Sequence, residues 1–253
     1  MSINKDDKKI KLIDFSNRKP GIYTLDILKK DWGNSSDKWL NGIHEGRARI
    51  IEDEMFLNNK DVKKKVLECK YPAGKFCPQE GGVQWKSHIS PKDEYFLEYK
   101  LKFSENFEWV MGGKLPGLAG GSTPTGGFGK KDGFSSRYMW RANGVYELYL
   151  YWSGQAAKYG DMIRPNIKFK RGDWHILKQY IKLNTPGEEN GIMKLYFDNK
   201  EIYRKDDFRF RLSRANWQIN YFLFSTFYGG NTIEWAPKKE NSIAFADFKI
   251  WTS

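Results

Sequence analysis

The sequence predicts an all-β protein: an antiparallel β-sandwich of the jelly-roll type, with few short helices. Aromatic residues make up 16% of the 253 residues, a composition that favours sheets over helical bundles. Many short segments alternate apolar and polar side chains between turn residues, and helical periodicity is almost absent. No linker-like tract divides the chain, so we expect one domain.

The N-terminal part of the chain is expected to contribute least to the sandwich. Residues 1–20 are rich in lysine and aperiodic, which predicts a basic tail ahead of a single jelly-roll domain at 21–253. Residues 22–40 have the pattern of a short helix, with Ser36 or Asp37 as its cap.

Strand signals begin near residue 47 and continue to the end of the chain. In EYFLEYKLKF, residues 94–103, every second side chain is apolar, which predicts a strand with one face in the core. GIMKLYFDNKEIYR, residues 191–204, predicts a hairpin that turns at Asp198 and Asn199. The apolar run at 216–230 predicts a strand buried on both faces near the sheet centre. Further strands are expected at 47–50, 66–72, 83–89, 174–183 and 242–251.

The charge of the chain restricts its partners. A formal net charge of +12 predicts a polyanionic partner, either nucleic acid, anionic lipid or an acidic polysaccharide. The cations are spread along the chain without a nucleic-acid-binding motif, and no run approaches the roughly 18 apolar residues of a membrane span. We therefore expect a monomer that binds an acidic polysaccharide and neither nucleic acid nor membrane. The N-terminus has no apolar signal segment, which predicts a soluble protein made in the cytoplasm that reaches an extracellular target by lysis or an unusual route.

Cysteines and histidines give no sign of a metal site. Cys69 and Cys77 bracket a predicted turn, and two thiols alone do not make a disulfide framework, so free thiols are favoured over a bridge. His44, His88 and His175 are scattered singly, without the spacing of metal ligands. We expect no metal and no cofactor.

The stretch from Trp109 to Trp152 contains the candidate site. Lys114 follows two glycines and precedes Leu-Pro-Gly, so its backbone is constrained. Two predicted strands follow, and alternate side chains on each share a face. The polar faces contain Ser135, Arg137, Met139 and Arg141 on the first strand and Glu147, Tyr149 and Tyr151 on the second. The more apolar faces, expected in the core, contain Phe134, Tyr138 and Trp140, then Tyr146, Leu148, Leu150 and Trp152.

A polar, cationic and phenolic sheet face suits an anionic substrate. Arg137 and Arg141 can hold carboxylates through paired hydrogen bonds, and Ser135 can add a neutral donor. Tyr149 and Tyr151 can act as acid or base beside cations. A uronic-acid chain would use all of these groups. Neutralising its carboxylate acidifies the C5 proton, a base removes that proton, and an acid protonates the oxygen that leaves C4.

Several motifs resemble polysaccharide lyase family 14, which includes algal-virus cell-wall lyases and mollusc alginate lyases. They are GGKLPGL, FSSRYMW and YELYLYW, with YPAGKFCPQEGGVQW before them and FSTFYGGNTIEWAPKKENSIAFADFKI near the C-terminus. The resemblance covers residues 45–253. It implies a jelly roll with a cleft on its concave sheet and metal-independent cleavage of uronate polysaccharides. Resemblance to the viral branch favours a virus-encoded enzyme and glucuronate chains of algal cell wall over alginate.

The resemblance also assigns residues. It implies catalytic roles for Lys114, Ser135, Arg137, Tyr149 and Tyr151. We add Ser136, Arg141 and Gly113 as substrate-binding residues, since the loop after Lys114 varies in length and Ser136 is an alternative match for Ser135.

Other functions remain to be compared with this one. The main alternative is a non-catalytic jelly-roll module that binds acidic polysaccharide. A glycoside hydrolase is disfavoured, because no Glu-x-Asp-x-Glu pattern occurs in a strand context. The sequence leaves open whether Lys114, Tyr149 or Tyr151 is the base, and whether cleavage is internal or from chain ends.

Overall fold

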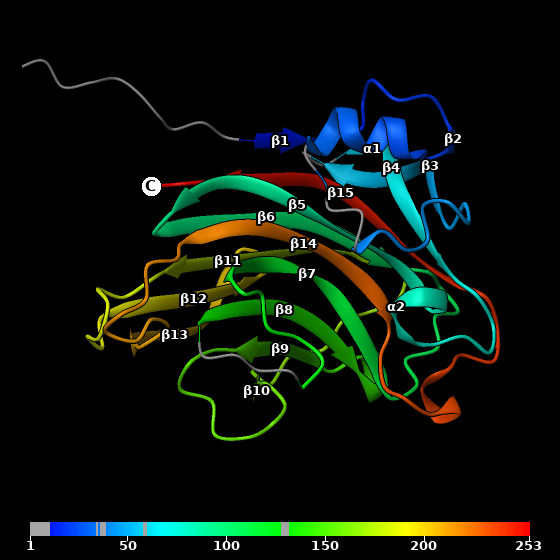
Figure 1. Ribbon diagram of the computed structural model, residues 1–253. Helices are drawn as coiled ribbons and strands as arrows, with labels where there is room; N and C mark the ends of the chain where they lie inside the picture. The colour runs from blue at the N-terminus through cyan, green and yellow to red at the C-terminus, as the bar shows by residue number, and fades with distance from the viewer. Residues whose placement is uncertain (1–10, 34, 36–38, 58–59, 128–131) are drawn as a thin grey trace, which may run out of the picture.

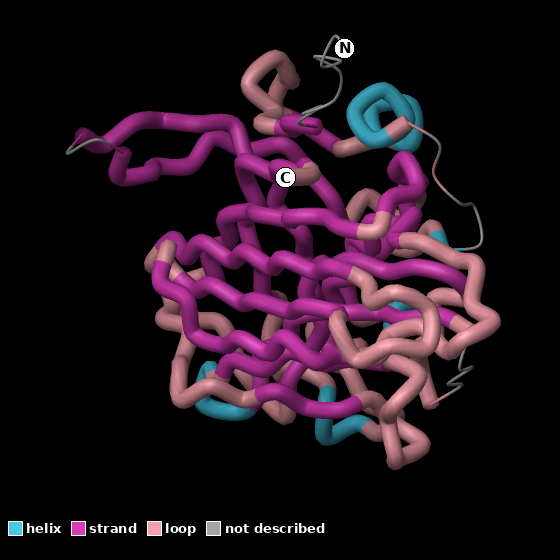
Figure 2. The backbone as a smooth tube through the Cα atoms, turned by 90° about the vertical axis from the view of Figure 1, so that its left-hand side faces the viewer, coloured by secondary structure: helices cyan, strands magenta, loops and turns pink. Residues whose placement is uncertain are grey.

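Two antiparallel sheets pack face to face in the computed structural model, which describes residues 11–33, 35, 39–57, 60–127 and 132–253 (Figure 1). Both sheets are curved, and helices are few and short (Figures 1 and 2). The predicted all-β sandwich is confirmed.

The larger sheet has nine strands, and β15 lies at its centre beside β6 and β4. In spatial order its strands are β13 (Lys200–Phe208), β12 (Gly191–Phe197), β11 (Trp174–Lys182), β6 (Glu94–Phe103), β15 (Asn241–Trp251), β4 (Lys60–Tyr71), β3 (Ala48–Leu57) and β2 (Gly21–Ile22), with β1 (Lys11–Ile13) paired to β15.

The smaller sheet has six strands and carries the stretch predicted to form the site. In spatial order they are β10 (Asp161–Ile163), β9 (Tyr146–Tyr151), β8 (Gly133–Arg141), β7 (Gly112–Gly121), β14 (Ile219–Tyr228) and β5 (Gly82–Lys92). The short helices in the described chain are α1 (Leu25–Trp32), α2 (Cys77–Glu80), η2 (Ala142–Gly144) and η3 (Ile233–Trp235).

Aromatic side chains fill the space between the sheets. Every second residue of β6, from Tyr95 to Phe103, is buried, as the alternation predicts. Trp85 of β5 stacks on Phe224 of β14, with ring centroids 3.7 Å apart. Such pairs add to the burial of large apolar surfaces and give the sandwich one continuous core.

The predicted hairpin at β12 and β13 is confirmed. Asp198 and Asn199 form its two-residue turn, with φ angles of 48° and 67°. Positive φ at both central residues matches the right-handed twist of the flanking strands, and Asn and Asp adopt it more readily than most residues.

The N-terminal segment is more ordered than the sequence predicts. Lys11–Ile13 pair with β15, and Ile13 and Phe15 are buried, so residues 11–20 belong to the domain and the predicted tail of residues 1–20 is too long. Residues 1–10 lie outside the described chain. The period-two signal is weak here because β1 has only three residues.

The predicted short helix is α1. Its cap is Thr24, whose side-chain oxygen accepts a hydrogen bond from the Ile27 amide at 3.4 Å. The predicted caps Ser36 and Asp37 fall outside the described residues. Leu28 and Trp32 form the buried face of α1, which explains why the helix packs on the sandwich.

The two cysteines are free, and His175 is held by hydrogen bonds on both ring nitrogens. Cys69 and Cys77 are free thiols, as predicted, and Cys69 is buried. His175 Nδ1 lies 3.0 Å from Asp198 Oδ2, and its Nε2 accepts from the Lys170 amide. In the described part of the chain, no helix is long and apolar enough to cross a membrane.

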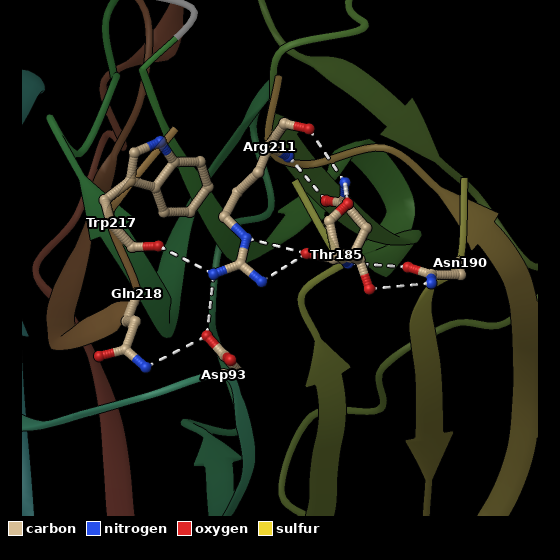
Figure 3. Close-up of polar contacts among 7 residues, drawn as sticks. Asp93, Thr185, Asn190, Arg211, Trp217 and Gln218 are labelled. Carbon is tan, nitrogen blue, oxygen red and sulfur yellow. Dashed lines mark hydrogen bonds and ion pairs between the residues drawn. The ribbon is translucent and has the colours of Figure 1, made fainter. Parts of the chain in front are cut away.

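A buried arginine ties together three loops at one end of the sandwich (Figure 3). Arg211 donates from Nε to the Asn184 carbonyl at 2.9 Å and from Nη1 to Asp93 Oδ1 at 2.9 Å and the Trp217 carbonyl at 3.2 Å. Its backbone amide donates to Asn184 Oδ1 at 2.7 Å. One side chain therefore satisfies carbonyls that would otherwise be buried without partners.

Arg211→Ala should lower the free energy of unfolding by about 2–4 kcal/mol, because it leaves the Asn184 carbonyl without these donors. Urea denaturation measures the change. Arg209→Ala is the control: that side chain is 49% exposed and pairs with Glu189 at 3.7 Å. It should change stability by less than about 0.5 kcal/mol. Equal effects from the two variants would disprove the role of Arg211.

Candidate active site

Lys114 lies at a β-bulge in β7. The register of β7 shifts between Lys114 and Gly117 against both of its neighbours, β8 and β14. Pro116 falls in the bulge, where its missing amide proton costs no ladder hydrogen bond. The Tyr99 hydroxyl donates to the Pro116 carbonyl at 3.0 Å from the opposite sheet. The glycines and the proline predicted a constrained backbone at Lys114, and the bulge is that constraint.

Two glycines of β7 permit close approach of neighbouring groups. A Cβ at Gly117 would lie 1.8 Å from the Ser136 carbonyl oxygen, so only glycine fits beside β8. A Cβ at Gly113 would lie 2.2 Å from the Trp140 ring. Gly113 is buried and is not among the residues that line the cleft, so its substrate-binding role stays a prediction. Its lack of a side chain serves packing.

The polar faces predicted for β8 and β9 come together on one side of the smaller sheet. Three rows cross β7, β8 and β9: Lys114–Met139–Glu147, Gly117–Arg137–Tyr149 and Ala119–Ser135–Tyr151. Their opposite faces, with Tyr138, Trp140 and Tyr146, enter the core. The predicted division into two faces is therefore confirmed.

A cleft of about 950 Å³ lies over these rows. Its floor includes Lys114, Arg137, Tyr149 and Tyr151, which come from three neighbouring strands. Residues far apart in the sequence form its sides, among them Trp39, Tyr159 and Trp235. A cleft with an aromatic rim and a cationic floor can hold a polymer of acidic sugars.

Lys114 has an environment that favours a neutral amine. Its Nζ lies 3.5 Å from the centroid of the Tyr149 ring and 2.8 Å from Met139 Sδ. Burial, followed by the nearby charges of Arg137 and Arg141, holds the pKa of Lys114 well below its usual value, although Glu147 acts in the opposite direction. The neutral, proton-accepting form of Lys114 is therefore present at a lower pH than that of an ordinary lysine.

Arg137 is almost completely enclosed, with 3% of its surface exposed. Its Nη1 donates to Ser225 Oγ at 3.3 Å, and its Nε has no hydrogen-bond partner in the described protein. Burial lowers the pKa of Arg137 to about 10, while Tyr151 and Tyr149 oppose this shift. A guanidinium with unused donors at a cleft floor is a suitable partner for a carboxylate.

The two tyrosines form a pair in which Tyr151 is anchored. Tyr151 Oη accepts a hydrogen bond from the Gly127 amide at 2.8 Å, and it lies 3.4 Å from Tyr149 Oη. Burial, and then the hydrogen bond with Tyr151, raise the pKa of Tyr149 above its ordinary value. Tyr149 therefore keeps its proton through the neutral range and can donate it.

The two serines do not line the cleft. Ser135 lies on the cleft side of β8, but it is fully buried and its hydroxyl donates to the Pro124 carbonyl at 2.6 Å. The loop after β7 therefore covers Ser135, and its contact with substrate stays a prediction. Ser136 is buried on the opposite face, where its hydroxyl has no partner among the described residues, and its substrate-binding role also stays a prediction. Strand alternation separates it from Arg137.

Arg141 does line the cleft, as predicted, but it is also part of an ion pair. Its guanidinium donates twice to Glu147 Oε1, at 2.7 Å from Nη2 and 3.0 Å from Nε. Glu147 is fully buried and pairs with Arg164 as well. The polar face of β9 contains Glu147, and its burial is not visible in the sequence pattern.

Gln84 and its partner Ser225, which contacts Arg137, escaped the sequence-based prediction. Gln84 of β5 lines the cleft and is 6% exposed, and Ser225 Oγ donates to its Oε1 at 3.4 Å. Gln84, Lys86 and His88 alternate with more apolar residues, a signal from which a polar face on β5 can be predicted. Ser225 lies in a run of apolar residues that hides its role.

A curved β-sandwich that encloses a lysine, an arginine and paired tyrosines in one cleft has the architecture of a polysaccharide lyase. The family model named Polysaccharide lyase 14 matches residues 59–248, and the chain belongs to this family.

One curated relative is exolysin from Paramecium bursaria Chlorella virus 1, which is 30% identical over 193 residues. The match covers 61% of this chain and 29% of exolysin, so the chain spans less than a third of that protein.

Solved structures share the fold. Alginate lyase Aly36B matches with a TM-score of 0.80 and 20% identity, over 98% of both chains. The PL-14 alginate lyase from Aplysia kurodai gives 0.74 and 23%, over 90% of this chain and 94% of that one. Alginate lyase vAL-1 from Chlorella virus gives 0.64 and 18%, over 85% and 98%.

Glu147→Gln should lower the pKa of Lys114 further, because it removes the negative charge that favours the protonated amine. The ¹³Cε chemical shift of Lys114, followed against pH, measures this. Glu98→Gln is the control: Glu98 pairs with Lys249 at 2.9 Å on the larger sheet, and its loss should leave Lys114 unchanged. A wild-type Lys114 that titrates at 10.5, the ordinary lysine value, would contradict the description of the site.

Proposed function

We propose that this chain cleaves uronic-acid polysaccharides by β-elimination and leaves an unsaturated uronate at the new end. The observation that carries the proposal is the grouping of Lys114, Arg137 and Tyr149 on one cleft floor. Their environments favour three different states: a neutral amine, an unpaired guanidinium and a protonated phenol. Elimination next to a carboxylate needs these three states together.

Arg137 is assigned the carboxylate. Its free donors hold the uronate group and neutralise its charge, which lowers the cost of placing negative charge on the adjacent C5 carbon. Because the site is enclosed, this electrostatic effect is stronger than it would be in water.

Lys114 and Tyr149 are assigned the two proton transfers. The neutral Lys114 amine takes the C5 proton, electrons from the C5–H bond form the C4=C5 double bond, and the C4–O bond breaks. The Tyr149 hydroxyl protonates the departing oxygen, with Tyr151 fixing its position through the 3.4 Å contact. Solvent then returns a proton to Tyr149 and removes one from Lys114, so the enzyme leaves the cycle unchanged.

The substrate is proposed as a class of acidic polymer. Membership of the polysaccharide lyase 14 family supports a polysaccharide, and the cationic cleft floor supports an anionic one. Solved relatives of this fold include alginate lyases and an endo-β-1,4-glucuronan lyase from Trichoderma reesei, which has a TM-score of 0.56. The preference for glucuronate chains stays a prediction, as do the monomeric state and action on an extracellular cell wall.

Wild-type protein incubated with glucuronan or alginate should produce the ultraviolet absorbance of unsaturated uronates. Lys114→Ala and Tyr149→Phe should each lower kcat by about 10²–10⁴-fold, as expected for loss of an acid or base. Tyr196→Phe, on the larger sheet, should cleave at the wild-type rate. A wild-type protein that binds both polymers without forming the chromophore would instead be a non-catalytic binding module.

The pH dependence of kcat should follow from the two proton carriers. Activity should rise as pH increases through the lowered pKa of Lys114, because only the neutral amine accepts a proton. It should persist beyond the ordinary titration of tyrosine, because the pKa of Tyr149 is raised. Glu147→Gln should move the acidic limb to lower pH, and Glu98→Gln should not move it. An acidic limb unaffected by Glu147→Gln would count against Lys114 as the base.

A further inference from the structure

Arg141 lines the cleft beyond the reacting residues and shares one carboxylate with Arg164, which contacts the cleft residue Met162. Glu147 is fully buried, and its two oxygens are divided between Arg141 and Arg164. Two guanidinium groups around one carboxylate leave a net positive charge at this end of the cleft. A buried carboxylate paired in this way holds both cations in fixed positions.

Arg141 is fixed on several sides. A Cβ at Gly112 would lie 3.0 Å from Arg141 Cδ, so glycine leaves the room that the stem of Arg141 occupies. Its guanidinium carbon lies 5.8 Å from the centroid of the Trp235 ring. Trp235 in turn rests on Gly230, where a Cβ would come within 2.1 Å of the indole. Arg141 and Trp235 both line the cleft.

Arg164 is held on one side and open on the other. Its Nε pairs with Glu147 and its Nη2 lies 3.1 Å from Met162 Sδ, while 51% of its side chain is exposed. Met162 lines the cleft and is itself 52% exposed. An arginine fixed through Nε with its far end in solvent beside an open cleft can still bind an anion.

We propose that Arg141 and Arg164, positioned by Glu147, form a second carboxylate site, which takes a uronate unit other than the one held at Arg137. This inference rests on the proposed function and names a part of the substrate that the reacting residues do not reach. Arg137 and Arg141 lie on the same face of β8, four residues apart, which is roughly 13 Å along a strand. Arg141 therefore faces a different stretch of the cleft floor from Arg137, two rows further along β8.

The surroundings also favour a sugar over a free inorganic anion. Trp235 and Tyr159 line the same cleft as Arg141, and Tyr159 is 55% exposed. Aromatic rings beside guanidinium groups provide an apolar surface for a sugar ring together with donors for its carboxylate. The second site therefore predicts selectivity for chains that carry uronates at successive positions.

The test compares Arg164→Ala with Arg204→Ala. Both side chains are 51% exposed, and Arg204 lies on β13 of the other sheet, paired with Asp206. Arg164→Ala should raise KM for the cleaved polymer by about tenfold, the effect of one charged hydrogen-bonding group, with kcat changed less than twofold. Arg164→Lys, which keeps the charge, should recover part of the loss. Arg204→Ala should leave KM within twofold of wild type.

Binding is measured separately from cleavage. In a Lys114→Ala background, calorimetric titration with glucuronan and alginate oligosaccharides should show weaker affinity when Arg164→Ala is added. The difference should vanish with carboxyl-reduced oligosaccharides, because a neutral sugar gives the arginines nothing to pair with. Thermal unfolding should show Arg164→Ala folded as wild type, since Arg164 is half-exposed.

The outcomes separate this inference from the proposed function. If wild type cleaves but Arg164→Ala matches Arg204→Ala in KM and affinity, the second site is disproved, and Arg164 serves only to neutralise Glu147. If wild type cleaves neither polymer, the proposed function fails. In that case an oligouronate affinity that depends on Arg164 would still support the site as a binding feature.

Discussion

The site depends on two cations that the fold encloses without giving them a carboxylate in direct contact. Within the described residues, Arg137 donates only to a serine, and Lys114 contacts a thioether and a tyrosine ring. Enclosing a charge without a counter-ion costs several kcal/mol, and one way to reduce that cost is for the amine to lose its proton. An anion bound beside Arg137 would supply the missing partner, so the arrangement that lowers the stability of the free protein would also strengthen anion binding.

The rest of the sandwich offsets this cost and fixes the geometry. The bulge at Lys114–Gly117 exists because Pro116 donates no hydrogen bond and Gly117 admits the carbonyl of β8. Tyr99 holds the bulge from the larger sheet. The aromatic core packs the two curved sheets together and the Arg211 cluster ties loops at one end, so enclosed groups can persist at the cleft floor.

Period-two alternation predicted the faces of β6, β8 and β9 correctly, because each pairs on both sides and the bulges in these ladders fall on β15 and β7 instead. The same rule places Ser136 on the core face, although the family resemblance offered it as an alternative to Ser135. Some features leave no local pattern in the sequence. They include residues that reach the cleft from loops, such as Trp235, and burial by segments that are distant in the sequence, as at Glu147. Ser135 was assigned to the correct face, but its cover by Pro124 depends on the path of a loop.

Glu147 lies among the cations of the cleft, but in the described chain it pairs with arginines and not with Lys114. Glu147 is close enough to oppose the loss of the proton from Lys114, yet its oxygens pair with Arg141 and Arg164. Had it paired directly with Lys114, the ammonium form would be stabilised and the base lost. The row Lys114–Met139–Glu147 places a thioether between the amine and the carboxylate, so Glu147 does not pair directly with Lys114.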